Sequence, residues 1–158
     1  MLLPPLSLYI HIPWCVRKCP YCDFNSHTEE SFQEAAYVQQ LLADLEQDLT
    51  FVQGRELRSI FFGGGTPSIF SAQAIAAILQ GVQQHIPFAE DMEITLEANP
   101  GTAEAEKFAG FRAAGVNRLS IGVQSFSAQH LQALGRIHDG NEAMRAVVMA
   151  KAAGFSRI

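Results

Sequence analysis

Three cysteines near the start of the chain are its strongest chemical signal. Cys15, Cys19 and Cys22 follow the spacing C-x3-C-x2-C and are the only cysteines among 158 residues. A disulfide would always leave one thiol over, so we interpret them as metal ligands rather than as three buried apolar thiols. Three ligands leave one coordination position open, either on a [4Fe-4S] cluster or on a zinc ion that keeps a water. Arg17 and Lys18 lie between the first two cysteines, where positive charge favours the thiolate that a metal requires.

A glycine-rich segment, Gly63-Gly64-Gly65-Thr66-Pro67, is the second signal. Consecutive glycines allow a ligand to approach the backbone closely and leave backbone N–H and C=O groups to bind it. The segment lacks the G-x-G-x-x-G pattern and the lysine of a P-loop, so it does not predict a phosphate-binding loop. Without the cysteines, a tight turn that needs glycine would be the favoured interpretation.

Polar side chains follow the later predicted strands. Glu97 closes the third strand, Gln124 follows the fourth, and Arg136 comes shortly afterwards. In a parallel barrel these positions meet at the same end, where active sites form. Taken singly, each is more often a solvated surface group. His11 could face the barrel interior, but a hydrogen-bonded core histidine is the favoured interpretation, and we assign it no catalytic role.

Hydrophobic periodicity predicts strands that alternate with helices along the whole chain. Pro13, the Gly63 to Pro67 segment and Asn99-Pro100-Gly101 end the first three strands, as expected for loops. Thr102 is a suitable N-cap for the third helix. The predicted strands cover 6–12, 59–62, 92–97 and 118–122, and the predicted helices cover 38–49, 75–86, 102–114, 127–134 and 141–153.

A short internal repeat supports parallel β-α units. Residues 113–119 (AAGVNRL) are echoed at 152–158 (AAGFSRI). In both copies the glycine, Gly115 or Gly154, would take the left-handed position that ends a helix before the next strand. The pattern predicts an α/β fold, either a barrel or a doubly wound sheet, with parallel strands covered by helices. Because the chain stops as a fifth strand begins, we expect a fragment of a longer protein.

Composition excludes several classes of partner. The net charge of −5 and the pI of about 5.5 leave no basic surface for nucleic acid or anionic lipid. No apolar run reaches the roughly 18 residues of a membrane span, and the first 12 residues lack a basic signal-peptide start. We therefore expect a cytoplasmic protein that meets a membrane only through its partners.

The motifs in this order resemble a known family. Tyr9-Ile-His-Ile-Pro-Trp-Cys15, the GGGTP segment, Glu97-Ala-Asn-Pro, Gly122-Val-Gln-Ser-Phe126 and Leu134-Gly-Arg-Ile-His138 are similar to radical S-adenosylmethionine (SAM) proteins of the oxygen-independent coproporphyrinogen III oxidase group. The resemblance implies an incomplete (β/α)6 radical SAM barrel over residues 1–158, truncated at the start of its fifth strand and lacking a C-terminal domain. It also implies that the three cysteines hold a [4Fe-4S] cluster. The positions that match the SAM contacts of the family are Tyr9, Tyr21, Gly64, Gly65, Thr66, Glu97, Gln124 and Arg136.

One position separates two branches of this family. The oxidases carry a further cysteine two residues after the third cluster ligand, where this chain has Phe24. The resemblance therefore favours the heme-chaperone branch, which binds heme and delivers it to heme-receiving proteins. A porphyrin-forming oxidase and a zinc-stabilised structural domain remain the alternatives. The open barrel edge of such a fragment is expected to favour aggregation.

Overall fold

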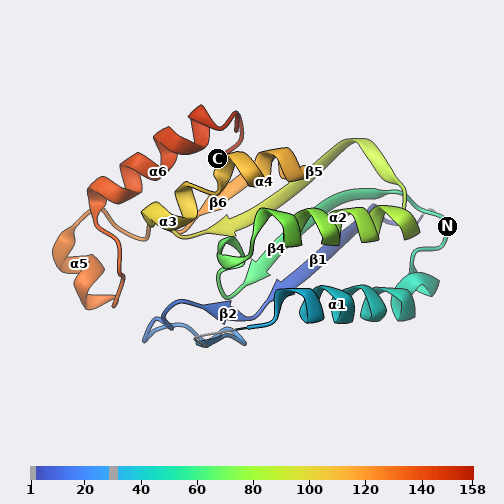
Figure 1. Cartoon of the computed structure of the whole chain (residues 1–158), viewed down its shortest axis with the longest axis horizontal. Coiled ribbons are helices and arrows are strands. Elements are labelled where there is room, and N and C mark those ends of the chain that lie inside the picture. The colour runs from blue at the N-terminus through green and yellow to red at the C-terminus, as the bar shows by residue number, and fades with distance from the viewer. Residues whose placement is uncertain (1–2, 29–31) are drawn as a thin grey trace.

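Four parallel strands form the main sheet. The computed structural model describes residues 3–28 and 32–158. The strands are β1 (Leu6–Ile12), β4 (Leu57–Gly64), β5 (Phe88–Ala98) and β6 (Arg118–Ile121), in the spatial order β1-β4-β5-β6. Each strand is added beside the one before it, as in a β/α barrel, and all run toward the same end of the molecule (Figure 1). A single parallel bridge from Arg157 to Arg118 starts a fifth strand next to β6. The predicted partial barrel is confirmed.

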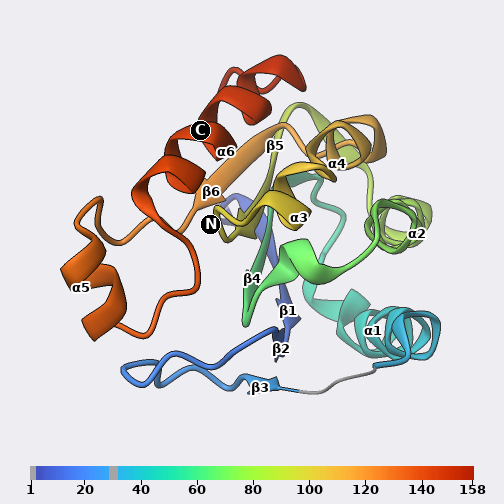
Figure 2. The same cartoon turned by 60° about the vertical axis from the view of Figure 1, so that its left-hand side comes forward.

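Helices cover one face of this sheet (Figure 2). The larger ones are α1 (Glu34–Asp48), α2 (Ala72–His85), α4 (Phe108–Ala114) and α6 (Gly140–Ala152). Shorter elements occupy the loops: β2 (Trp14–Cys15), β3 (His27–Thr28), the 3-10 turns η1 (Leu49–Phe51) and η2 (Pro67–Ile69), α3 (Thr102–Ala105) and α5 (Ala128–Ala133). None of the helices in the described ranges is both long enough and apolar enough to cross a bilayer.

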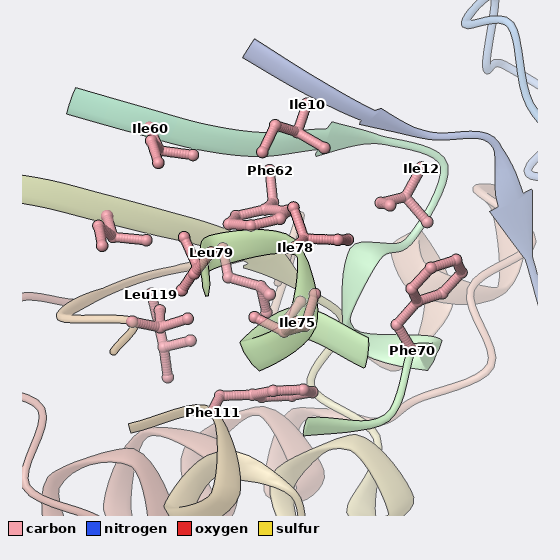
Figure 3. Close-up of a cluster of buried hydrophobic side chains, with 14 of the residues drawn as sticks. Ile10, Ile12, Ile60, Phe62, Phe70, Ile75, Ile78, Leu79, Phe111 and Leu119 are labelled. Carbon is pink, nitrogen blue, oxygen red and sulfur yellow. The ribbon is translucent and has the colours of Figure 1, made fainter. Parts of the chain in front are cut away.

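One face of the sheet is apolar and the other carries polar side chains. Side chains alternate between the faces along each strand, and the register of neighbouring strands aligns like positions in rows. Ile10, Phe62, Leu96 and Leu119 form one row across the four strands and are at most 5% exposed. Figure 3 shows Ile10, Phe62 and Leu119 of this row in one cluster with Ile75, Ile78 and Leu79 of α2 and Phe111 of α4. Burial of each such side chain stabilises the fold by about 1.5–3 kcal/mol. The alternate positions lie on the opposite face of the sheet and include Tyr9, His11, Thr95 and Glu97. The core thus fixes the sheet while its other face is left for polar side chains.

Two predicted elements differ from the structure. β4 continues through Gly63 and Gly64, because Gly64 pairs with Ile12 at the end of β1, so the expected turn begins two residues later. The helix expected over 102–114 is broken at Glu106 and Lys107 into α3 and α4. Lys107 donates to the carbonyl of Ile69 at 2.8 Å, and this contact holds the chain in a bend that helix propensity did not indicate. Thr102 is the first residue of α3, and its side chain lies outside the described part of the structure.

The repeat at the ends of α4 and α6 is confirmed. Gly115 has φ +116° and Gly154 has φ +90°. In each copy the next residue returns a hydrogen bond to the last helical turn, Val116 to Phe111 and Phe155 to Ala150, both at 3.1 Å. This is the Schellman pattern that left-handed glycine permits.

An aromatic cluster anchors the start of the cysteine loop. The ring of Trp14 lies 4.8 Å from that of Phe32, 4.6 Å from that of Tyr37 and 5.8 Å from that of Phe70. Tyr37 also donates its hydroxyl to the carbonyl of His11 at 2.8 Å. Cys15 therefore follows a residue that is fixed on several sides.

Candidate functional site

A cleft of about 260 Å³ lies at the carboxyl end of the sheet, where the loops after the strands meet. Ten of the eleven predicted site residues line it: Cys15, Cys19, Cys22, Tyr21, Gly64, Gly65, Thr66, Glu97, Gln124 and Arg136. Tyr9 does not line the cleft. Residues up to 121 positions apart in the sequence are thus brought together.

The cysteine loop is closed at its base and turned at its tip. β2 pairs with β3 through Trp14–His27 and Cys15–Thr28, which ties the two ends of the loop together. The amide of Cys22 donates to the carbonyl of Cys19 at 3.0 Å, which makes a turn between the second and third thiols. Lys18 does not face a thiol: its ammonium group donates to the carbonyls of Phe24 and Ser26 at 3.2 and 3.1 Å. Hydrogen bonds within the protein therefore hold the conformation of the cysteine loop.

The donor set fits a cluster better than a single ion. In the described ranges, no three Cys, His, Asp or Glu side chains are grouped so that they could hold one metal ion. A [4Fe-4S] cluster does not need three thiolates close enough to bind one ion, because each thiolate binds a separate iron. The three thiols are unpaired, partly exposed and on the wall of one cleft, which fits such a cluster.

Arg136, distant in the sequence, places its guanidinium beside a thiol. Its Nη1 lies 3.4 Å from the Cys19 sulfur and 3.5 Å from the Tyr21 hydroxyl. Its Nη2 donates to the Asn99 side-chain oxygen and to the Gly122 carbonyl, both at 2.7 Å. The guanidinium is thus held in a fixed orientation beside the cysteine loop, where it would offset negative charge on a thiolate-bound cluster.

The glycine segment packs against the cysteine loop. A Cβ atom on Gly65 would lie 2.5 Å from the Trp14 carbonyl oxygen and 3.0 Å from the Cys15 sulfur, and one on Gly64 would lie 2.7 Å from the His11 ring. The amides of Gly65 and Thr66 donate to the Ile12 and Trp14 carbonyls, both at 2.8 Å. The expectation that these N–H groups are left for a ligand is therefore wrong. Close packing requires the glycines, and any backbone contact with a ligand would come from carbonyl groups.

Glu97 is a half-buried carboxyl group in the wall of the cleft. Burial raises the pKa of Glu97 above its usual range, and a hydrogen bond from the Gly64 amide acts in the opposite direction. Tyr9 lies next to it on the same face of the sheet, and burial followed by the charge of Glu97 raises the pKa of Tyr9. Glu97 can thus accept further hydrogen bonds from a ligand.

His11 has the hydrogen bonds that were expected of it, but it is partly exposed and does not lie in the core. Its Nε2 donates to the Asn25 carbonyl at 2.8 Å, and its Nδ1 accepts from the Tyr9 hydroxyl at 3.0 Å. Tyr9 is thereby linked through His11 to the cysteine loop, although it is outside the cleft.

Two polar lining residues, Asn99 and Ser120, were not singled out as site residues from the sequence. Asn99 donates to the Thr66 hydroxyl at 3.1 Å and accepts from Arg136, so it joins the glycine segment to the arginine. Ser120 lies beside Glu97 in the register of β5 and β6 and also lines the cleft. The available signal was the two-residue period of a strand, which places Asn99 on the same side as Glu97.

Comparison with known proteins agrees with this architecture. The profile of the radical SAM superfamily matches residues 9–158, and the chain belongs to that superfamily. Membership implies a [4Fe-4S] cluster and SAM as cofactors. The resemblance noted from the motifs is confirmed.

Within this superfamily, the chain is similar to heme chaperones and to a coproporphyrinogen III oxidase. The chain is 58% identical over 154 residues to the heme chaperone HemW of Escherichia coli and 57% identical over 158 residues to that of Haemophilus influenzae. Each match covers 97% of this chain and 41% of the relative, so the chain spans about two fifths of their length. Among solved structures, the coproporphyrinogen III oxidase HemN of Escherichia coli, described as a radical SAM enzyme, matches with a TM-score of 0.79 and 31% identity. That match covers 96% of this chain and 35% of that chain.

Proposed function

We propose that this chain is the cluster- and SAM-binding part of a heme chaperone, which binds heme and delivers it to target proteins. The observation that carries the proposal is the meeting of three unpaired thiols with Glu97, Gln124 and Arg136 in one cleft. The similarity to heme chaperones at 57–58% identity supports the chaperone assignment.

In this proposal some cleft residues bind the cluster and others bind SAM. Cys15, Cys19 and Cys22 bind three irons and leave the fourth for SAM. Glu97 accepts hydrogen bonds from SAM hydroxyl or amino groups, and Gln124 offers an amide that both donates and accepts. Tyr21, Gly64, Gly65 and Thr66 shape the walls around the ligand, with Tyr9 just below them. Tyr21 lies close enough to Arg136 and Cys19 to shield the cluster side of the cleft.

A reduced [4Fe-4S] cluster with bound SAM supplies one-electron cleavage of the sulfonium carbon–sulfur bond. The protein's own part is to hold the two groups together and limit the access of water. Arg136 serves the first purpose, because one guanidinium contacts the cysteine loop, the Asn99 side chain and the end of β6 at once.

Phe24 favours the chaperone over the oxidase. This side chain is 67% exposed and lines the cleft where the oxidase pattern places a further cysteine. The lower identity to the oxidase structure, 31%, points the same way. An oxygen-independent coproporphyrinogen III oxidase is the second candidate, because the fold and the cysteine spacing are shared.

The first experiment tests cofactor binding. The full-length protein that contains this chain is reconstituted anaerobically with iron and sulfide, and electron paramagnetic resonance of the reduced sample is recorded with and without SAM. We expect a [4Fe-4S] signal that changes on adding SAM. The matched variants are Cys19→Ser, which should lose the signal, and Arg58→Ala, an exposed residue at the opposite end of the sheet, which should keep it. Zinc uptake without a cluster would overturn the proposal.

The second experiment separates chaperone from oxidase. Heme is titrated into the cluster-loaded protein and followed by its absorption, and transfer to an apo-heme protein is then measured. A parallel assay looks for decarboxylated porphyrin after coproporphyrinogen III, SAM and a reductant are added. We expect heme binding and transfer without porphyrin product, and product formation without heme transfer would establish the oxidase instead.

We also propose a cytoplasmic location. Three unpaired cysteines that serve as cluster ligands require a reducing compartment. Fractionation with detection of the tagged full-length protein checks this directly.

A further inference from the structure

The segment that carries Gln124 has an unusual backbone. The Val123 amide donates to the Ile121 carbonyl at 3.0 Å, and the Ser125 amide donates to the Val123 carbonyl at 2.8 Å. Gln124 is the central residue of the second turn and has φ +64°. A γ-turn with a positive central φ is rare for any residue with a side chain. Other contacts must therefore hold this backbone.

His138 provides such a contact from the segment before α6. It is 5% exposed, and its Nε2 donates to the Val123 carbonyl at 3.0 Å. This is the same carbonyl that accepts from Ser125, so it closes the turn around Gln124. Because a carbonyl can only accept, Nε2 carries a proton, and in the neutral imidazole Nδ1 is then bare.

The other ring nitrogen argues against a simple packing role. Nδ1 of His138 is buried and has no hydrogen-bond partner within the described ranges. An unpaired buried acceptor destabilises a fold, so an apolar side chain would fill this space better. Burial also lowers the pKa of His138, which keeps the imidazole neutral. An apolar side chain could not donate a hydrogen bond to the Val123 carbonyl, whereas Nε2 of His138 does.

Arg136 makes a second tie between the same two segments. It donates to the carbonyl of Gly122 at 2.7 Å, next to the carbonyl that His138 holds. The two segments also approach closely, since a Cβ atom on Gly140 would lie 2.9 Å from the Phe126 carbonyl oxygen. The two backbone carbonyls directly before Gln124 are thus held by two side chains, Arg136 and His138, that lie two residues apart.

We propose that His138 is a positioning residue: its hydrogen bond to the Val123 carbonyl holds Gln124 in its turn and orients the Gln124 side chain toward SAM in the cleft. The proposal rests on the proposed SAM site and adds to it a residue that lines a neighbouring cavity instead of the cleft. His138 acts only through Val123 and Gln124.

The test uses the full-length, cluster-loaded protein with His138→Gln and His138→Leu. The glutamine amide can donate from about the same reach as Nε2, whereas leucine cannot donate at all. SAM affinity is measured by calorimetry, and hydrogen–deuterium exchange of residues 121–127 is measured without SAM. We expect the leucine variant to bind SAM about tenfold more weakly, since one buried hydrogen bond is lost. Its Ser125 amide should exchange faster, and the glutamine variant should stay within about threefold of the wild type in both measurements.

A double variant shows whether the effect passes through Gln124. In a Gln124→Ala background, His138→Leu should weaken SAM binding much less, because the side chain to be positioned is gone. If the leucine variant does not fold, His138→Asn replaces it, because its shorter amide cannot reach the Val123 carbonyl.

Two results would overturn the proposal. In the first, the leucine or asparagine variant matches the wild type in SAM affinity and exchange. In the second, the glutamine variant is as defective as leucine, which would show that shape alone matters. A wild-type protein that does not bind SAM would refute the proposed function instead, and the exchange measurement would still decide whether His138 holds the turn.

Discussion

Replacing Gly65 by alanine tests whether the glycine segment exists to seat the cysteine loop. The new Cβ would lie 2.5 Å from the Trp14 carbonyl oxygen, 2.8 Å from the Trp14 carbonyl carbon and 3.0 Å from the Cys15 sulfur. Two of these atoms are backbone and cannot rotate away. The strand that carries Trp14 and Cys15 would have to move, although the ring of Trp14 is packed among three other aromatic rings.

The expected magnitude follows from these contacts. Overpacking of a tight site costs about 1–3 kcal/mol. The shift would also weaken the hydrogen bonds from Gly65 to Ile12 and from Thr66 to Trp14, each of which contributes about 0.5–1.5 kcal/mol. We expect the free energy of unfolding to fall by about 2–4 kcal/mol. Because Cys15 moves with the strand, iron content after reconstitution should fall as well.

Urea unfolding of the apo protein and iron and sulfide analysis after reconstitution are the assays. Gly54→Ala is the matched control, because Gly54 has φ +73° and no atom lies within 4 Å of its new Cβ. It should lose about 1–2 kcal/mol through backbone strain and still bind a complete cluster. If Gly65→Ala takes up iron, sulfide and SAM like the wild type, the argument that this glycine seats Cys15 is refuted.

Three further predictions concern charge and packing. Burial raises the pKa of Glu97, so the stability that this group contributes is present below its ordinary pKa of 4.5 and is lost as pH rises through the raised value. Glu97→Gln should therefore melt higher than the wild type at pH 7 but not at pH 4 in SAM-free thermal scans, while binding SAM more weakly; equal melting at both values would contradict this. Lys107→Met should lower the free energy of unfolding by about 1–3 kcal/mol in urea titrations, because it removes the donor to three carbonyls at the end of η2. Phe111→Ala should cost about 3–5 kcal/mol in the same titration because Phe111 is fully buried, and a loss below 1 kcal/mol would show that the core repacks around it.

The regular elements were predictable because their signals are local. Alternation of apolar residues gave the bounds of β1 without error, and the repeated Ala-Ala-Gly corner located the ends of two helices. The bend at Lys107 was not predictable, since its cause is a contact with carbonyls near residue 69, distant in the sequence. The capping box of Asp139 and Glu142, which starts α6, was readable from the sequence but was not used.

Sequence reasoning named most of the residues that line the cleft but not the contacts between them, and the cofactor roles of these residues stay predictions. The cysteine spacing and the polar residues after each strand identified the wall of the cleft. Arg136 is 117 residues from Cys19 in the sequence, yet its guanidinium lies beside the Cys19 thiol. This contact depends on the path of α5 and its flanking loops, which the sequence pattern does not indicate. The γ-turn at Gln124 likewise has no local sequence signature, because glutamine gives no sign of a positive φ.

The position of Trp14 provides an optical reporter for this protein. It is the only tryptophan in the chain, and it directly precedes Cys15, the first proposed cluster ligand, within a fixed aromatic cluster. Iron–sulfur clusters absorb broadly where indole emits, so energy transfer should quench its fluorescence as iron and sulfide are incorporated. Assembly and loss of the cluster could then be followed in real time in the chain described here, without a label and at low concentration. In a longer protein, any further tryptophan would add a constant background to this signal.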